Sequence, residues 1–433
     1  MPKNILVVCP TQRDYRELAI LEERANKNFH SPLKFTYFPP DEDKLNLINS
    51  HLVQNHFQLH QNFLNLLKLP SKEQIEAVFY TSDFPGTSLA ALIAHELNLP
   101  GPHPEIAIRS QHKYYARLDQ QQIVPEATPY FMYIEPELID QIYPSLPFPS
   151  FIKPIKSAFS IGAQKLKNYH ELCNYLVQKR NKHAIDLFEN ILKTIMLSHT
   201  IKSSNFILEE LLEGEQVTLE GFVYNHEVTI IGIVDSVMFP NSLSFARFQY
   251  PSNLPDHIQK KMITIAKKYI CGLKLNNLFF NIEFMYNAKK NTVHIIELNP
   301  RLVSQFADLY EKVDGIHSYQ LLLDLICGKK PLYEKKQGQY KYAASCVLRI
   351  FQDQFVVKVP TQQNITTLYE QFPESRFELC CQENKKLSDV LQDGHSYRYG
   401  LVHLGGNSQE DILEKFKESQ KILNFILKPS SFS

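Results

Sequence analysis

The chain alternates between continuous apolar runs and longer amphipathic segments, a pattern that predicts buried strands interleaved with helices. Ile5–Cys9 is apolar throughout, as expected of a strand buried on both faces, and Ala77–Tyr80 is a second such run. The spacing of apolar positions predicts helices over residues 14–25, 43–67, 88–98 and 110–122. This order of strands and helices predicts a small α/β domain at the start of the chain.

The remainder of the chain has a mixed α+β pattern. Short apolar runs predict strands over residues 151–154, 206–210, 217–223, 227–234, 343–350, 355–359 and 401–404. Helical spacing recurs over residues 169–180, 184–198, 257–269, 315–327 and 409–426. A chain of 433 residues is long enough for two or three domains with a large core.

The stretch from Asn277 to Arg301 predicts a β-hairpin, because two apolar strands flank a polar turn at 287–291. In the first strand, Asn281 and Glu283 share one face, while Phe280, Ile282 and Phe284 share the other. In the second strand, Glu297 and Asn299 also point the same way. Folding the hairpin brings Glu283 near Glu297, either directly opposite or on a diagonal.

Crowded carboxylates on apolar strands require a cation, because like charges repel and resist burial. Glu283, Glu297 and Asn299 offer hard oxygen atoms, which favours Mg²⁺ over zinc. A Mg²⁺ ion that is bound by only a few protein ligands usually also binds phosphate groups. Arg301 adds a positive fork for an anion. The alternative interpretation is a surface hairpin with a solvated acidic face.

Composition excludes several classes of function. The formal net charge is zero and no dense Lys/Arg run occurs, which argues against a nucleic-acid or membrane-surface binder. The first apolar run is too short for a signal peptide, and no stretch reaches the length of a membrane span. The seven cysteines form no Cys-x-x-Cys pair, so we expect buried, reduced thiols in a cytoplasmic protein. A redox-active pair at Cys380–Cys381 is an alternative.

Two further motifs suggest nucleotide binding. Residues 151–162 combine a strand, Lys153 and a small-residue loop, which can fold over a polyphosphate and donate backbone N–H groups to it. Residues 208–216 form a strand edge and a glycine turn, where exposed backbone can bind a planar base and Glu215 or Gln216 can hold ribose hydroxyls. The alternatives are a hairpin turn with a surface lysine and a solvated acidic turn.

In chain order, these pieces are a lysine on a helix, Lys-Pro with a small-residue loop, Glu-Glu-x-x-x-Gly, Asn-x-Glu-Phe and Glu-x-Asn-Pro-Arg. The series resembles the ATP-grasp superfamily, in particular its carboxylate–amine ligases and the biotin carboxylase branch, over roughly residues 75–330. The resemblance implies an ATP-grasp fold of class α/β and α+β. It implies an N-terminal α/β domain over 1–109, a two-lobed ATP-grasp domain over 110–330 with its nucleotide-binding lobe at about 125–207, and a C-terminal α+β region over 331–433.

The resemblance also implies roles for individual residues. Those matching the family's nucleotide contacts are Lys113 and Lys153 for the phosphates, Ser160 to Gly162 for the flexible loop, and Glu209, Glu210 and Leu212 for adenine. The family's ribose-binding glutamate falls on Gln216, so the ribose contact lies with Glu215 or Gln216. The Mg²⁺ ligands match Glu283, Glu297 and Asn299. Arg301 matches the arginine that faces the substrate carboxylate and acyl phosphate, and Lys153 and Arg301 are the implied catalytic residues.

The implied activity joins a small carboxylate, an amino acid or similar acid, to an amine through an acyl phosphate, with release of ADP and phosphate. ATP and two Mg²⁺ ions are the implied cofactors, with Mn²⁺ as an alternative metal. Acid and amine are the expected partners, and a homodimer is left open. Arg247 is a second candidate for contacting the acid, its alternative being a surface arginine beside aromatic residues. Two other interpretations remain: a biotin-carboxylase-like carboxylating enzyme and a non-catalytic nucleotide-binding protein.

Overall fold

A three-stranded parallel sheet of order β2-β1-β3 begins the chain. The computed structural model describes residues 3–27, 33–38, 75–139, 146–157, 161–178, 205–390, 392 and 396–429. The elements of the first unit are β1 Lys3–Val8, α1 Gln12–Lys27, β2 Leu33–Phe38, β3 Ala77–Phe79 and α4 Gly86–Glu96. The predicted strands and the helices over 14–25 and 88–98 are therefore confirmed. The helices predicted over 43–67 and 184–198 lie outside the described residues, as does Ser160.

The predicted helix over 110–122 is wrong in its boundaries, because two helices occupy this region: α5 Pro104–Gln111 and α6 Lys113–Ile123. His112 separates them with an extended backbone, at φ −96° and ψ 100°. Its imidazole Nδ1 accepts a hydrogen bond from the backbone N–H of Tyr115, 3.2 Å away, and so caps the start of α6. The cap places Lys113 in the first turn of the second helix.

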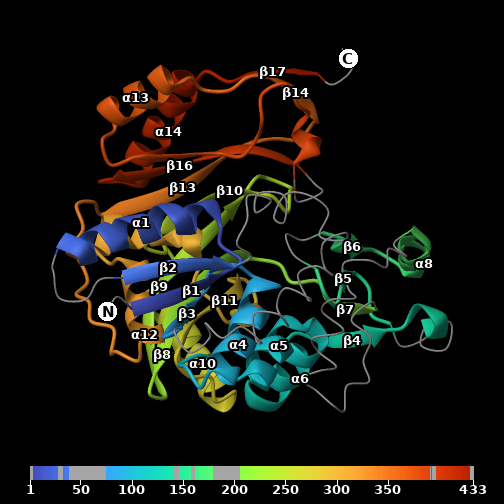
Figure 1. Ribbon diagram of the computed structural model, residues 1–433. Helices are drawn as coiled ribbons and strands as arrows, with labels where there is room; N and C mark the ends of the chain where they lie inside the picture. Colours follow the sequence, from blue (N-terminus) through green and yellow to red (C-terminus); the bar gives the residue numbers. More distant parts are fainter. Residues whose placement is uncertain are drawn as a thin grey trace.

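A small antiparallel sheet of order β4-β7-β5-β6 projects from the rest of the molecule, in the teal region of Figure 1. Its strands are β4 Phe131–Ile134, β5 Ser150–Pro154, β6 Gln164–Leu166 and β7 Phe206–Glu210, and α8 Tyr169–Gln178 packs on one face. Buried Ile152, Leu172 and Leu208 fill the space between helix and sheet. The sheet lies within the segment predicted as the nucleotide-binding lobe.

The central element is an eight-stranded sheet of order β12-β11-β8-β9-β10-β13-β16-β15. Its first five strands are β8 Glu215–Tyr224, β9 Glu227–Met238, β10 Phe245–Tyr250, β11 Leu278–Asn287 and β12 Thr292–Asn299. Helix α10 Asp256–Gly272 covers one face of β8 and β11, while α11 Ala307–Asp314, α12 Ser318–Ile326 and the N-terminal unit pack against the other. This second face also carries the polar residues discussed below.

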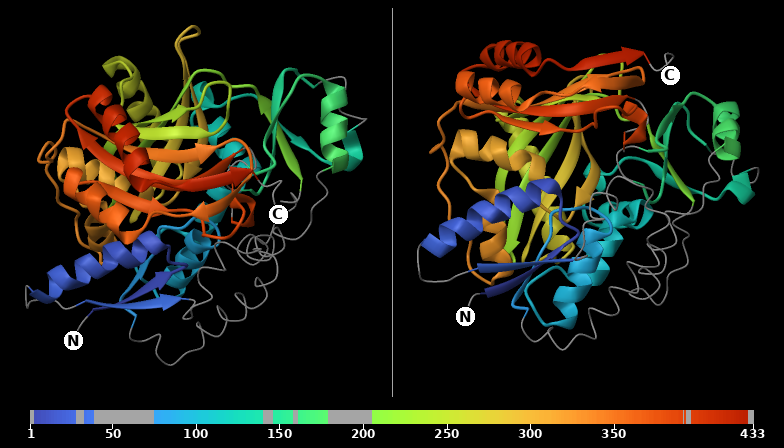
Figure 2. Two further views of the ribbon diagram at one scale, coloured as in Figure 1. Left: turned by 90° about the horizontal axis from the view of Figure 1, so that it is seen from above. Right: turned by 45° about the horizontal axis from the view of Figure 1, so that its top comes forward.

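The C-terminal strands continue the same sheet and do not form a separate one, as both views of Figure 2 show. They are β13 Tyr342–Ile350, β15 Arg376–Leu379 and β16 Tyr397–Gly406, with α13 Gln362–Gln371 and α14 Gln409–Leu423 packed on one side. Strands β14 Gln354–Lys358 and β17 Ile426–Pro429 pair separately. The sheet therefore crosses residue 330, and the three-part division of the chain remains a proposal.

Two further helix predictions need correction. The helix predicted over 315–327 is α12, which begins only at Ser318, and the preceding helix α11 was not predicted. Gly315 ends α11 in the left-handed conformation, at φ 70°, so it closes one helix and cannot begin the next. The final helix stops at Leu423 and not at 426, because Asn424 adopts a left-handed φ of 46°. None of the helices in the described ranges is long and apolar enough to cross a membrane.

All seven cysteines lie within the described residues, and none forms a disulfide. Burial raises the pKa of the Cys381 thiol to about 12 and also raises that of Cys380, which disfavours the thiolate that redox exchange requires. The redox alternative for this pair therefore has no support here. The expectation of buried thiols is corrected, because only Cys346 and Cys381 are buried, Cys271 is exposed on α10 and the other four are partly exposed.

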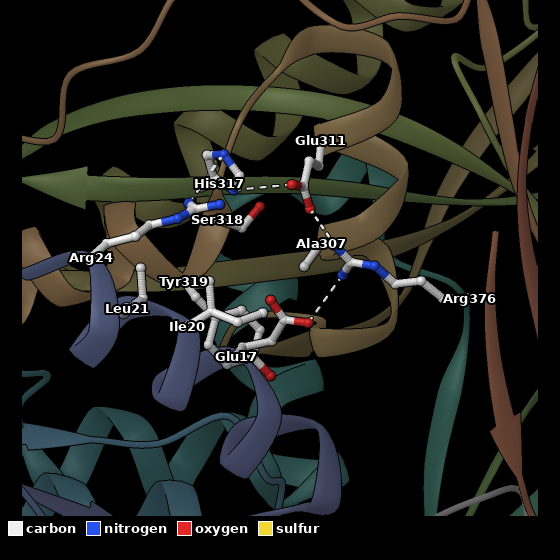
Figure 3. Close-up of a pocket in the computed structure, with 10 residues that line it drawn as sticks. All are labelled: Glu17, Ile20, Leu21, Arg24, Ala307, Glu311, His317, Ser318, Tyr319 and Arg376. Carbon is white, nitrogen blue, oxygen red and sulfur yellow. Dashed lines mark hydrogen bonds and ion pairs between the residues drawn. The ribbon is translucent and has the colours of Figure 1, made fainter. Parts of the chain in front are cut away.

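Arg376 on β15 joins three distant elements, β15, α1 and α11, through ion pairs. Its guanidinium lies 3.0 Å from Glu17 of α1, 3.0 Å from Asp308 and 2.8 Å from Glu311, both of α11. Figure 3 shows this junction as a pocket whose opposite side is lined by Arg24 and His317. The residues that line this pocket do not include Glu283 or Glu297 of β11 and β12.

We expect Arg376→Met to lower the free energy of unfolding by about 2 kcal/mol, because three carboxylates lose the cation that they share. The value is set below that of a fully buried pair because the Arg376 side chain is 26% exposed. Urea unfolding followed by circular dichroism measures the change.

The matched control is Lys268→Met, which removes a 2.9 Å ion pair with Glu126 whose side chains are about half exposed. We expect its free energy of unfolding to change by less than about 1 kcal/mol, because solvent screens such pairs. Equal effects of the two substitutions would show that Arg376 does not hold β15, α1 and α11 together.

Candidate functional site

The hairpin of β11 and β12 places Glu283 directly opposite Glu297 and Asn281 directly opposite Asn299. The predicted hairpin is thus confirmed, and the two carboxylates are opposite and not diagonal. A bulge follows Glu283, where Ile296 has no partner in the register. The other face of β11 packs under α10 through Phe280, Ile282 and Phe284. Apolar burial of one face therefore directs the polar residues to the other.

The two carboxylates, both partly exposed, repel each other. Burial and then the charge of Glu297 raise the pKa of Glu283 to about 7. The Nε2 atom of Gln216 donates a 2.9 Å hydrogen bond to Oε2 of Glu283 and holds that carboxylate in place. Such a set of hard oxygen donors fits Mg²⁺, whose charge would relieve the repulsion. The described residues contain no group of three or more His, Cys, Asp or Glu side chains that suits a metal, so Asn299 would supply the third donor.

Lys113 links this carboxylate pair to the loop after β5. Its Nζ lies 3.6 Å from Oε1 of Glu297 and donates a 2.9 Å hydrogen bond to the carbonyl of Ser157. The backbone of this lysine lies in the first turn of α6, which His112 caps. An anion at this position would meet an ammonium group already directed toward the hairpin.

Lys153 lies in a buried ion cluster at the base of the small sheet. Its Nζ lies 2.8 Å from Glu209, and the Nε of Arg117 lies 2.7 Å from the other oxygen of the same carboxylate. Although burial opposes ionisation, Arg117 and Lys153 lower the pKa of Glu209 to about 2. Arg117 also donates to the carbonyl of Ile296 at 2.9 Å. One arginine thus ties the small sheet to the bulge beside Glu297.

The other predicted nucleotide residues occupy the junction between the two sheets. Glu210 exchanges backbone and side-chain hydrogen bonds with Tyr130, at 3.0 and 3.1 Å. Leu212 follows in the turn, and Glu215 is exposed at the start of β8. Gly162 adopts φ +78°, where an added Cβ would meet Pro154 at 2.9 Å. The adenine, ribose and loop assignments stay predictions, and Gln216 is bound to Glu283 in this structure.

Arg247 does not share the face of the carboxylates. The pairing register shows which side chains share the face of Glu283 on the neighbouring strands. They are Thr218 on β8, Val234 and Ser236 on β9, and Phe248 on β10. Arg247 precedes Phe248 in β10 and therefore points to the opposite face, where its Nε donates to Gln249 at 2.9 Å. The register thus corrects the suggestion that Arg247 meets the acid beside Arg301.

Lys156 and Asp83 join the site, although the sequence did not assign them a role in it. Burial lowers the pKa of Lys156 to about 8, and its charged neighbours are Asp83, Lys113, Glu297 and Arg301. Burial raises the pKa of Asp83, but Lys156 and Arg301 lower it overall below its ordinary value. The signal for Asp83 was its place after the strand β3, at the ligand edge of a parallel sheet. Lys156 carried no comparable signal.

Comparison with known proteins gives three findings. A family model of the ATP-grasp domain matches residues 146–309. Two curated relatives are carbamoyl phosphate synthase large chains. The one from Clostridium acetobutylicum is 22% identical over 183 residues, and the one from Caldanaerobacter subterraneus is 26% identical over 189 residues. The matches cover 42% and 43% of this chain but only 15% of each relative.

Solved structures match over nearly the whole chain. The L-amino acid ligase of Bacillus licheniformis has a TM-score of 0.73 at 16% identity and covers 98% of both chains. Phosphoribosylglycinamide synthetase of Anaerococcus prevotii has a TM-score of 0.64 at 18% identity, over 99% of this chain and 100% of that one. Biotin carboxylase of Campylobacter jejuni has a TM-score of 0.63 at 15% identity, over 99% and 92%. At these identities the likeness establishes the fold.

Proposed function

We propose that this chain, which has the ATP-grasp fold and carries an ATP-grasp domain at residues 146–309, is an ATP-dependent ligase that joins a small acid to an amine. The observation that carries the proposal is the pair of opposed carboxylates, Glu283 and Glu297, with Lys113 of α6 3.6 Å from Glu297 and the charge of Arg301, just after β12, acting on Glu283. Opposed, partly exposed carboxylates beside cationic groups suit a metal-bound polyphosphate and an acid substrate.

The residues suit both halves of such a reaction. Glu283, Glu297 and Asn299 would hold Mg²⁺, which neutralises phosphate charge when bound. Lys113 and Lys153 would contact the phosphate oxygens of ATP, and Arg301 would orient the acid. A carboxylate oxygen of the acid attacks the γ-phosphorus, the bond to the β-phosphate oxygen breaks, and ADP leaves. The amine nitrogen then attacks the acyl carbon, and inorganic phosphate and a proton leave.

Catalysis in this scheme comes from positioning and charge, since phosphoryl transfer needs little covalent help from the protein. Arg301 gives the acid a fixed geometry, while Lys113 and Lys153 stabilise charge on the phosphates. The small sheet, with Lys153 on β5, is proposed as the nucleotide-binding lobe at about 125–207. This assignment agrees with the ion cluster that joins the small sheet to the hairpin.

An amino acid is the favoured acid substrate. The L-amino acid ligase has a TM-score of 0.73 and covers 98% of each chain, compared with 0.63 for the biotin carboxylase. This difference supports an amino acid ligase over a carboxylating enzyme. It is a likeness of fold, and the identity of the acid and amine therefore has to come from experiment.

The decisive experiment measures ADP release with Mg²⁺-ATP and pairs of the common L-amino acids, with mass spectrometry of the products. We expect ADP release to require two amino acids, with a product whose mass equals their sum less one water. Turnover that needs bicarbonate and biotin, without amino acids, would favour the carboxylating alternative. Tight ATP binding with no turnover under any of these conditions would favour a non-catalytic nucleotide-binding protein.

A further inference from the structure

The backbone that follows β12 is held by two buried polar side chains. The segment begins with the N–H of Arg301, which donates to the carbonyl of Asn299 at 2.9 Å. The Nδ2 of Asn281 then donates to the carbonyl of Arg301 at 3.0 Å. Two residues further on, the N–H of Val303 donates to Oε1 of Glu220 at 2.5 Å. The segment at 301–303 is thus anchored at both of its ends, at Arg301 and at Val303.

The two anchors are neighbours in the central sheet. Asn281 of β11 is paired with Glu220 of β8, and both point to the face that carries Glu283 and Glu297. Asn281 is 2% exposed and Glu220 is fully buried. Because the two side chains come from adjacent strands of one ladder, the segment that they hold has a fixed position relative to the carboxylate pair.

A fully buried carboxyl group is costly unless it makes a specific contact. Burial raises the pKa of Glu220 to about 8, against the opposing effects of the Val303 N–H, the Tyr310 hydroxyl and the charge of Arg301. The hydrogen bond from the Val303 N–H needs an acceptor oxygen on Glu220 but no negative charge. The surrounding core, which includes Tyr250 stacked edge-on against Tyr310 at 4.9 Å, leaves that oxygen little freedom to move.

We infer that Glu220 is a positioning residue that holds the segment at 301–303, and through it the guanidinium of Arg301, for the acid substrate. The inference rests on the proposed function for the role of Arg301, but the hydrogen bond to Val303 stands independently of it. The contact assigns Glu220 to the acid half of the site and not to the nucleotide half.

Three variants distinguish the loss of the hydrogen bond between Val303 and Glu220 from a general loss of stability. Glu220→Gln keeps an acceptor oxygen for the Val303 N–H, whereas Glu220→Ala removes it. The matched control is Asp314→Ala. Asp314 is also a buried carboxylate of this core, but it accepts from the Tyr250 hydroxyl and the Lys336 N–H, away from the segment at 301–303.

Hydrogen exchange of the peptide spanning 300–306 tests the anchor without any substrate. We expect exchange in this peptide to be about tenfold faster or more in Glu220→Ala, and unchanged in Glu220→Gln and Asp314→Ala. Thermal melts with circular dichroism show whether each variant is folded. Unchanged protection in a folded Glu220→Ala variant would overturn the anchor. If Glu220→Ala does not fold, faster exchange in Glu220→Gln than in wild type would overturn the requirement for an acceptor alone.

Steady-state kinetics with the amino acid pair that gives most ADP release tests the role in positioning. We expect Glu220→Ala to raise the KM of the acyl-donating amino acid about tenfold or more, with the KM of ATP within about twofold of wild type. Glu220→Gln should restore both values. An equal rise in both KM values would overturn the inference. If wild type turns over no pair, the proposed function fails, and the exchange experiment alone decides whether the anchor exists.

Discussion

Glu297→Gln is expected to lose most Mg²⁺-dependent ATP turnover, by about 100-fold or more, because a proposed, charged metal ligand becomes a neutral amide. Glu297 lies opposite Glu283 in the hairpin and beside Lys113, so its charge belongs to the site and not to the solvated surface. The substitution is nearly isosteric, and it removes one of two repelling carboxylates. The fold should therefore be retained.

The measurement is ADP release over a range of Mg²⁺ concentrations with the active amino acid pair, alongside thermal melts. Glu227→Gln is the matched control, since Glu227 is an exposed carboxylate at the far end of β9, 3.9 Å from Lys330. It should behave as wild type. Wild-type turnover by a folded Glu297→Gln variant would refute the assignment of the metal ligands.

Lys153→Ala and Arg301→Ala are expected to impair different substrates, ATP in the first variant and the acid in the second. Lys153→Ala should weaken ATP binding about tenfold or more, because it removes a buried ammonium group from the proposed phosphate site. Arg117 remains paired with Glu209 in this variant, which keeps the buried carboxylate compensated. Arg301→Ala should leave ATP affinity within about twofold of wild type and raise the KM of the acid about tenfold or more.

Calorimetry of ATP binding and the Michaelis constant for the acid, measured on both variants, test this division. Lys165→Ala serves as the control for a lost lysine in the same small sheet, since Lys165 is exposed on β6. The assignment of Lys153 to ATP and Arg301 to the acid is refuted if Arg301→Ala loses ATP affinity as severely as Lys153→Ala while use of the acid is unchanged.

The carboxylate hairpin was predictable because its information is local. Alternation of polar and apolar residues places Glu283 and Glu297 on one face of each strand, and the polar turn joins the strands. The directly opposed pairing was not predictable, because it depends on a bulge after Glu283 that no local pattern marks. A shift of one residue would have moved one carboxylate to the face under α10.

The break at His112 and the end of α11 at Gly315 show a similar limit. In both places helical spacing continues across the boundary, so the pattern alone predicts a single helix or misplaces its start. His112 ends the first helix by adopting an extended backbone, and Gly315 does so by adopting a left-handed one. Backbone conformation at a single residue outweighs the spacing around it.

The sequence by itself determined the hairpin, the ATP-grasp motifs and the residue types of the candidate site, because strand alternation and motif spacing depend on near neighbours. Tertiary structure decided which charges meet. Arg117 reaches Glu209 across 92 residues, and Asp83 joins Lys156 from a separate sheet. It also decided that Arg247 faces away, since its direction follows from the register of four neighbouring strands. Contacts between distant segments depend on how sheets and helices pack together, and that packing has no local signature.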